Sequence, residues 1–157
     1  SLMLLIVGFG WAKPVRVNAY AVNRKTELGM MLVSLAGPLS NFLLAILFAV
    51  PLRFQFISSA AASSSVFLQF LEDFFIRMVT INLLLMLFNM LPLAPLDGEK
   101  VALVAFPPKW GYALEKISRY SGFILLALIL LPRLIGFDIL GFILYPPLQN
   151  LYMILVG

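Results

Sequence analysis

The chain has 157 residues, of which 62% are hydrophobic and 11% are charged, and its mean hydropathy is +1.04. Soluble domains are about 45–50% apolar and about 25% charged, so this composition excludes a disordered chain and an ordinary soluble globule and predicts a membrane protein. The net charge of +4 bears on orientation in a membrane and does not indicate a nucleic-acid partner. The chain contains no Cys and no His, which excludes disulfides and thiolate or imidazole metal ligands from its own residues.

The apolar runs, taken in chain order, predict an all-α polytopic membrane protein that forms one transmembrane domain over residues 1–157. A spanning helix needs roughly 20 mostly apolar residues, and such runs predict helices over 28–52, 74–91 and 112–131. Residues 53–73 are expected to form a loop. The run over 139–156 contains Pro146-Pro147, which predicts a hairpin or a broken helix. Alternation over 15–22 predicts a small membrane-associated β element.

Small residues and prolines suggest how the helices meet and where they break. Proline at position 38 should kink the first helix because it removes one backbone hydrogen bond. Small or polar residues recur on one face of that helix at three- and four-residue steps, which favours close helix packing in lipid; they are Ser34, Gly37, Asn41, Ala45 and Ala49. Pro92 and Pro95 are expected to hold residues 93–96 extended.

Asp97 is the most informative single residue, because it follows an apolar stretch that contains no charge after Arg77. Carboxylates at membrane depth are costly and commonly mark a functional site. The structural alternative is that Asp97 caps a short helix beginning at Gly98. The two roles are compatible.

Asn82 and Asn89 are seven residues apart and therefore share a face of the predicted 74–91 helix. Polar side chains on spanning helices commonly form hydrogen bonds between helices, worth about 0.6–2 kcal/mol each. This interpretation is the simplest one for Asn82. Asn89 is closer to Asp97 and is a candidate for the same site.

Three motifs occur in order along the chain: residues 8–15 (GFGWAKPV), 36–41 (AGPLSN) and 89–98 (NMLPLAPLDG). Their order and spacing resemble the site-2 protease family of intramembrane zinc metalloproteases, and its compact bacterial branch in particular. The third motif is the most specific. The resemblance extends from about residue 2 to about residue 120 and implies a site-2-protease-like core.

The resemblance implies a role for two residues. Asp97 matches the carboxylate ligand of the catalytic zinc, and Asn89 matches an asparagine that helps to hold the substrate or stabilise the oxyanion. Residues 11–22 match a partly β segment near the site. The resemblance also implies zinc as the cofactor, a transmembrane protein as the substrate, the lipid bilayer as the surroundings and a bacterial cell membrane as the location.

The family's two His ligands and its Glu base, which stand in a His-Glu-x-x-His helix, have no match in this chain. A zinc hydrolase usually has three protein ligands and one open position, and this chain offers one. Because the chain begins at Ser1 inside an apolar run, we expect it to be the C-terminal part of a longer protease. The alternatives are a catalytically inactive relative and a non-enzymatic subunit of a membrane complex or transporter.

Overall fold

The computed structural model describes residues 27–56 and 65–157, and this part of the chain is built from helices without strands. The helices, in chain order, are α3 (Glu27–Arg53), α5 (Val66–Asn89), α6 (Asp97–Ala105), α7 (Pro108–Ile135) and α8 (Ile139–Val156). The all-helical prediction is therefore confirmed for these residues. The β element predicted over 15–22 lies outside the described residues.

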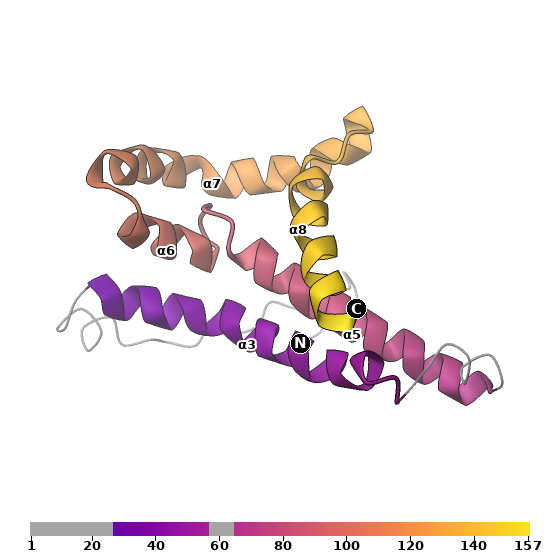
Figure 1. Cartoon of the computed structure of the whole chain (residues 1–157). Coiled ribbons are helices and arrows are strands. Elements are labelled where there is room, and N and C mark those ends of the chain that lie inside the picture. The colour runs from indigo at the N-terminus through magenta and orange to yellow at the C-terminus, as the bar shows by residue number, and fades with distance from the viewer. Residues whose placement is uncertain (1–26, 57–64) are drawn as a thin grey trace, which may run out of the picture.

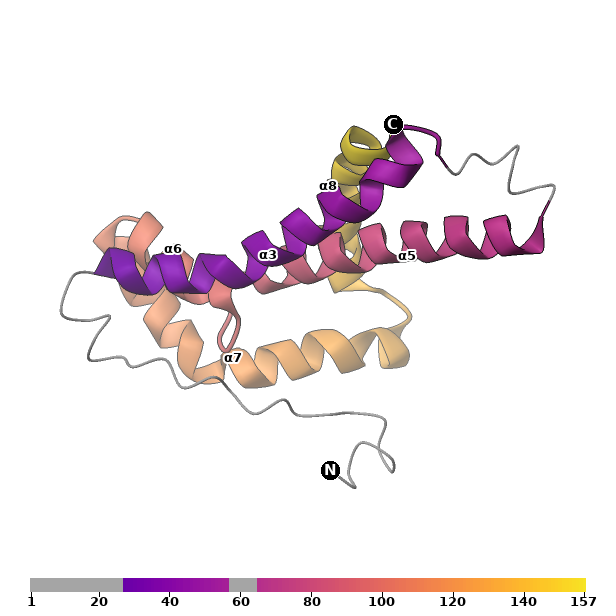
Figure 2. The ribbon, with the colours of Figure 1, turned by 90° about the horizontal axis from the view of Figure 1, so that it is seen from below.

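The most extensive helix packing in the described residues is that of α3 against α5, which run side by side in opposite directions (Figures 1 and 2). Ala45 and Ala49 of α3 meet Val79 and Leu83 of α5, and all four side chains are buried. Because alanine side chains are small, the two backbones approach closely. Helix α8 packs across this pair and contributes Leu148, among other side chains, to the core.

Two helices, Leu28–Arg53 and Ile139–Val156, are long and apolar enough to cross a membrane. On α3, the face opposite the core carries large exposed side chains, including Leu32, Leu43 and Leu47. Exposed apolar stripes of this kind are expected on a helix that faces lipid. They add to the indication from helix length and composition.

The helix over 28–52 was predicted correctly within one residue at each end. Proline 38 lies inside the continuous helix α3, and Figure 2 shows that the helix changes direction along its length. The predicted face of small residues is largely confirmed, since Ser34, Ala45 and Ala49 are buried. Gly37 is instead exposed, and its neighbour in space is described below.

Three predicted helix ends were wrong. Helix α5 begins at Val66, so residues 66–73 are helical and the loop after α3 is shorter than predicted. The segment contains neither Gly nor Pro, and its charged residues do not interrupt a helix. Helix α7 begins at Pro108 and passes Pro132 to end at Ile135. Its C-cap is Gly136, whose φ of 70° supplies the left-handed conformation typical of helix ends.

The prediction of a broken C-terminal segment was also wrong, because α8 is one helix through Pro146 and Pro147. The fixed φ of proline, about −65°, is a helical value, and the cost of proline comes from a lost hydrogen bond and a clash. Apolar surroundings and neighbouring helices allow spanning helices to tolerate that cost. The side chain of Asp138 caps the start of α8 by accepting from the Gly141 amide at 2.9 Å.

Candidate functional site

The site predicted from the sequence lies at the connection between α5 and α6. Helix α5 ends at Asn89 and α6 begins at Asp97, so no helix runs through residues 92–96, as predicted. The segment 93–96 is not extended, which corrects the prediction: the Leu96 amide donates to the Leu93 carbonyl at 2.8 Å and closes a turn, within which the Ala94–Pro95 peptide is cis. A reversal of the chain brings α6 back onto the end of α5.

Gly98 makes the closest contact in this connection. It is buried, and a Cβ atom at this position would overlap the backbone of Met90 and Leu91. Only glycine therefore allows the first turn of α6 to lie against the end of α5. As a result, the residue after Asp97 touches the residue after Asn89, and both candidate residues stand at one place in the fold.

The carboxylate of Asp97 lies against α3. A Cβ atom on Gly37 would be 3.1 Å from Asp97 Oδ2, so the missing side chain of Gly37 leaves room for the carboxylate. Asp97 is half-buried. It is the first residue of α6 and the N-cap is Leu96, without a side-chain cap hydrogen bond. The interpretation of Asp97 as a cap before Gly98 was therefore wrong, although an acidic side chain in the first turn still suits the helix dipole.

The two asparagines of α5 differ in their surroundings. Asn89 is the last residue of the helix and is half-buried. Asn82 is buried, and its Nδ2 donates to the Met78 carbonyl of the same helix at 2.8 Å. The hydrogen bond that the structure shows for Asn82 thus lies within its own helix rather than between helices, because an amide on a helix can reach the carbonyl one turn before it.

One contact at this site was not anticipated from the sequence. Ser118 Oγ of α7 donates to Glu99 Oε1 of α6, and both residues are half-buried. Residues two apart on a helix point about 200° from each other, so Glu99 faces α7 while Asp97 faces α3. The sequence signal for this contact was an acidic residue two positions after Asp97, but the serine that donates to it is 19 residues further along the chain.

The described residues do not form a zinc site by themselves. No group of three or more His, Cys, Asp or Glu side chains is placed to hold a metal within 27–56 and 65–157, and the whole sequence lacks His and Cys. Asp97 can supply one oxygen ligand, beside the open face of Gly37. A catalytic zinc needs further ligands, and the described residues do not bring any beside Asp97, so no chemical step through a metal follows from them.

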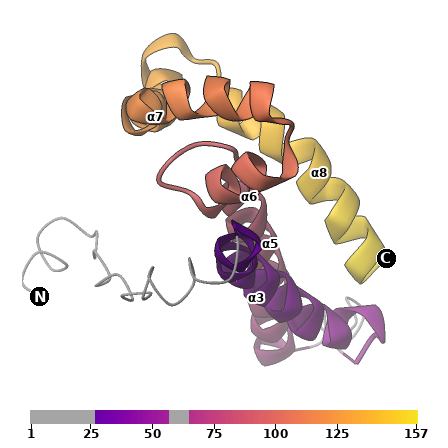
Figure 3. The ribbon, with the colours of Figure 1, turned by 90° about the vertical axis from the view of Figure 1, so that its left-hand side faces the viewer.

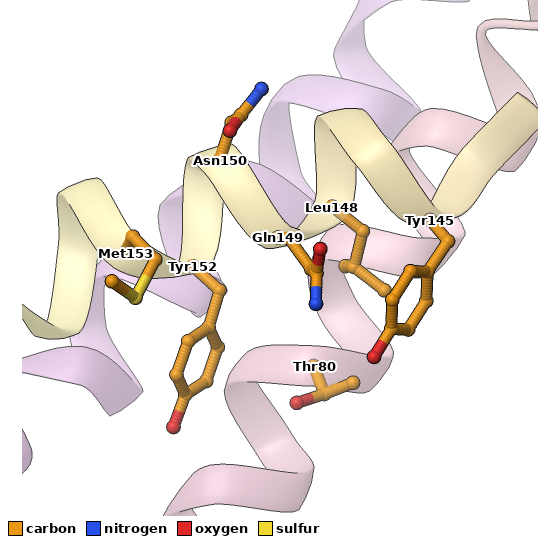
Figure 4. A pocket seen from close by; sticks show the side chains of 7 residues that line it. All are labelled: Thr80, Tyr145, Leu148, Gln149, Asn150, Tyr152 and Met153. Carbon is orange, nitrogen blue, oxygen red and sulfur yellow. The ribbon is translucent and has the colours of Figure 1, made fainter.

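Two cavities lie beside α8, away from the Asp97 carboxylate. One, of about 450 Å³, lies between α5 and α8. Figure 4 shows Tyr145 and Gln149 of α8 directed toward Thr80 of α5. The polar residues that line this cavity carry hydroxyl or amide groups and no charge. The other, of about 590 Å³, is mostly apolar; it lies among α5, α7 and α8 and is lined in part by Phe88, the neighbour of Asn89.

Comparison with known proteins identifies one related sequence. The chain is 35% identical over 134 residues to a Bacillus subtilis (strain 168) protein described as "Putative zinc metalloprotease YwhC", and the match covers 84% of this chain and 59% of that protein. The chain thus spans about three-fifths of the length of the relative. No family model matches the chain, and no solved structure matches it. The similarity supports a relationship to a metalloprotease family.

Proposed function

We propose that this chain is part of an intramembrane zinc metalloprotease of the site-2 type, which hydrolyses peptide bonds in the membrane segments of other proteins. The observation that carries the proposal is the 35% identity, over 84% of the chain, to a protein described as a zinc metalloprotease. The relative is longer than this chain, so the activity is proposed for the full-length protein. The proposed location is a bacterial cell membrane.

The membrane setting is supported by α3 and α8. Both helices are long and apolar enough to span a bilayer, and large apolar side chains such as Leu43 and Phe142 are exposed on them. Backbone that is not helical is tolerated at membrane depth only where protein or a water-filled cavity surrounds it. The turn at 93–96 meets this condition in part, since Leu96 and Gly98 beside it are buried.

Asp97 is proposed as the carboxylate ligand that this chain contributes to zinc. Its half-buried carboxylate lies beside the backbone of Gly37, and the further ligands are proposed to come from elsewhere in the full-length protein. When bound, zinc supplies Lewis acidity and an acidified water for hydrolysis. Carboxylate oxygens of Asp and Glu are common zinc ligands.

Asn89 is proposed to hold the substrate backbone or to stabilise the negative charge that develops on its carbonyl oxygen. An amide N–H₂ group is a suitable donor for that charge, and Asn89 stands at the connection that carries Asp97. The apolar cavity beside Phe88 is of a chemistry that suits an apolar segment of the substrate. These assignments explain why polar residues stand at the end of a largely apolar helix.

The test compares Asp97→Ala with Asp73→Ala in the full-length protein. Asp73 is a matched control because its carboxylate is exposed near the start of α5, whereas the candidate site lies at the other end of that helix. We expect stoichiometric zinc and cleavage of a model transmembrane substrate in the wild type and in the control, and loss of both in Asp97→Ala. Metal content is measured on purified protein, and cleavage is measured in liposomes.

Two outcomes would contradict the proposal. Wild-type zinc content and cleavage in Asp97→Ala would remove Asp97 from the metal site. A wild-type protein that binds no zinc and cleaves nothing would favour one of the two alternatives for this chain, which has no His. These alternatives are a non-catalytic relative and a subunit of a membrane complex.

A further inference from the structure

Helix α6 is short and is held on two sides. It has nine residues and lies between α7 on one side and α3 on the other (Figure 3). Gly98 and Ala102 are its buried residues, and neither has a side chain large enough to lock into a neighbouring helix. Small side chains allow close approach but resist rotation of the helix weakly.

The polar contacts of α6 are better suited to set its rotation about its own axis. Asp97 points toward Gly37 of α3, and Glu99 accepts a hydrogen bond from Ser118 of α7. Because the two side chains leave the helix about 200° apart, any rotation that moves Glu99 away from α7 also moves Asp97 along α3. A hydrogen bond to a carboxylate is stronger than one between neutral groups.

We propose that Glu99 is a positioning residue, which holds the Asp97 carboxylate against α3 through its hydrogen bond to Ser118. This inference rests on the proposed role of Asp97 at the metal, because the placement of that carboxylate matters most if it is a ligand. Glu99 itself contacts α7 and is not assigned to the metal. Its role is to fix the angle at which α6 presents Asp97.

The absence of Cys from the natural chain allows this placement to be measured directly. A Cβ atom at position 37 would lie 3.1 Å from Asp97 Oδ2, so Gly37→Cys combined with Asp97→Cys places two thiols within reach of a disulfide. The rate of disulfide formation in the folded protein then reports how often α6 holds position 97 against position 37.

The measurement compares substitutions in this two-cysteine background. We expect Glu99→Ala and Ser118→Ala each to slow disulfide formation about tenfold, near the lower bound for a hydrogen bond to a charged group. The double variant should be no slower than either single variant, because both remove the same bond. Glu99→Gln should restore the rate to within about threefold of the parent, since its side-chain oxygen still accepts from Ser118 but a neutral bond is about half as strong as one to a carboxylate.

The matched control is Ser121→Ala. Ser121 is buried one turn further along α7, and its hydroxyl donates to the Ile117 carbonyl of its own helix at 3.2 Å. Its loss removes a hydroxyl from α7 without removing a bond to α6. An unchanged rate of disulfide formation in Ser121→Ala supports the proposal, and slowing equal to that of Ser118→Ala would overturn it. Parental rates in both Glu99→Ala and Ser118→Ala would also overturn it.

A second measurement separates this inference from the proposed function. In the full-length protein with its natural Asp97, Glu99→Ala should lower zinc affinity about tenfold, as expected for residues that orient a ligand, while Glu99→Gln should lower it about threefold or less. If the disulfide rates respond as expected but the wild type holds no zinc, the positioning role stands and the proposed metalloprotease function fails. If zinc is bound and neither readout responds to Glu99→Ala, the positioning role fails alone.

Discussion

Replacing Gly98 with Ala tests the packing that brings Asn89 and Asp97 together. The added Cβ would overlap backbone atoms of Met90 and Leu91, and backbone atoms at a helix end cannot rotate away as a side chain can. The first turn of α6 must therefore move off the end of α5. Overpacking of this kind costs about 1–3 kcal/mol, and the better helix propensity of Ala returns about 0.5–1 kcal/mol.

The expected net loss from Gly98→Ala is thus about 0–2.5 kcal/mol at the unfolding midpoint. For a chain of this size, each kcal/mol shifts Tm by about 2–4 °C, so Tm should fall by up to about 10 °C. The matched control is Gly122→Ala on α7, where a Cβ would meet nothing within 4 Å and the helix should gain stability. Thermal unfolding of both variants in detergent, followed by circular dichroism, gives the comparison. Equal midpoints for the two variants would refute the contact between α6 and α5.

Four further substitutions test other parts of the site and fold. Asn89→Ala should lower cleavage by about 10²–10³ with zinc content kept, whereas Asn82→Ala should lower stability modestly and keep turnover per folded molecule; equal effects would leave Asn89 as a packing residue. Gly37→Ala should displace the flexible Asp97 carboxylate, which should weaken zinc binding about tenfold and change Tm little. An unchanged zinc affinity would contradict the placement of Asp97. Arg53→Met removes the 3.1 Å bond from Nη1 to the Ile154 carbonyl and should speed amide exchange at the end of α8, which an unchanged exchange rate would disprove.

The helices that the sequence predicted well are those in which one signal dominates. The run over 28–52 is apolar throughout, and α3 begins and ends within one residue of the prediction. The break after α5 was also predictable, because Pro92 and Pro95 stand close together and a helix cannot continue through both at ordinary cost. Composition and the spacing of prolines are local properties of the sequence, so they predict a helix or a break without knowledge of the fold.

The prolines of α7 and α8 show where that reasoning fails. Pro132 lies inside the last turn of α7, and Pro146-Pro147 lie within α8 without ending it. Each of these prolines still removes one N–H donor from its helix. Whether a proline ends a helix depends on the surroundings that compensate for the lost hydrogen bond. Those surroundings come from other helices, so the outcome cannot be read from the proline alone.

The placement of Asp97 is the clearest case of information that is spread along the chain. A carboxylate in an apolar stretch predicted a site, but the position of Asp97 depends on two glycines. Gly98 allows α6 to touch the end of α5, and Gly37 leaves room on α3 for the Asp97 carboxylate. A local pattern treats each glycine as a break or a small residue and says nothing of what occupies the space beside it. Since Glu99 finds its partner on α7, the carboxylate at position 97 is set by contacts with three helices, and a substitution on any of them can displace it without touching it.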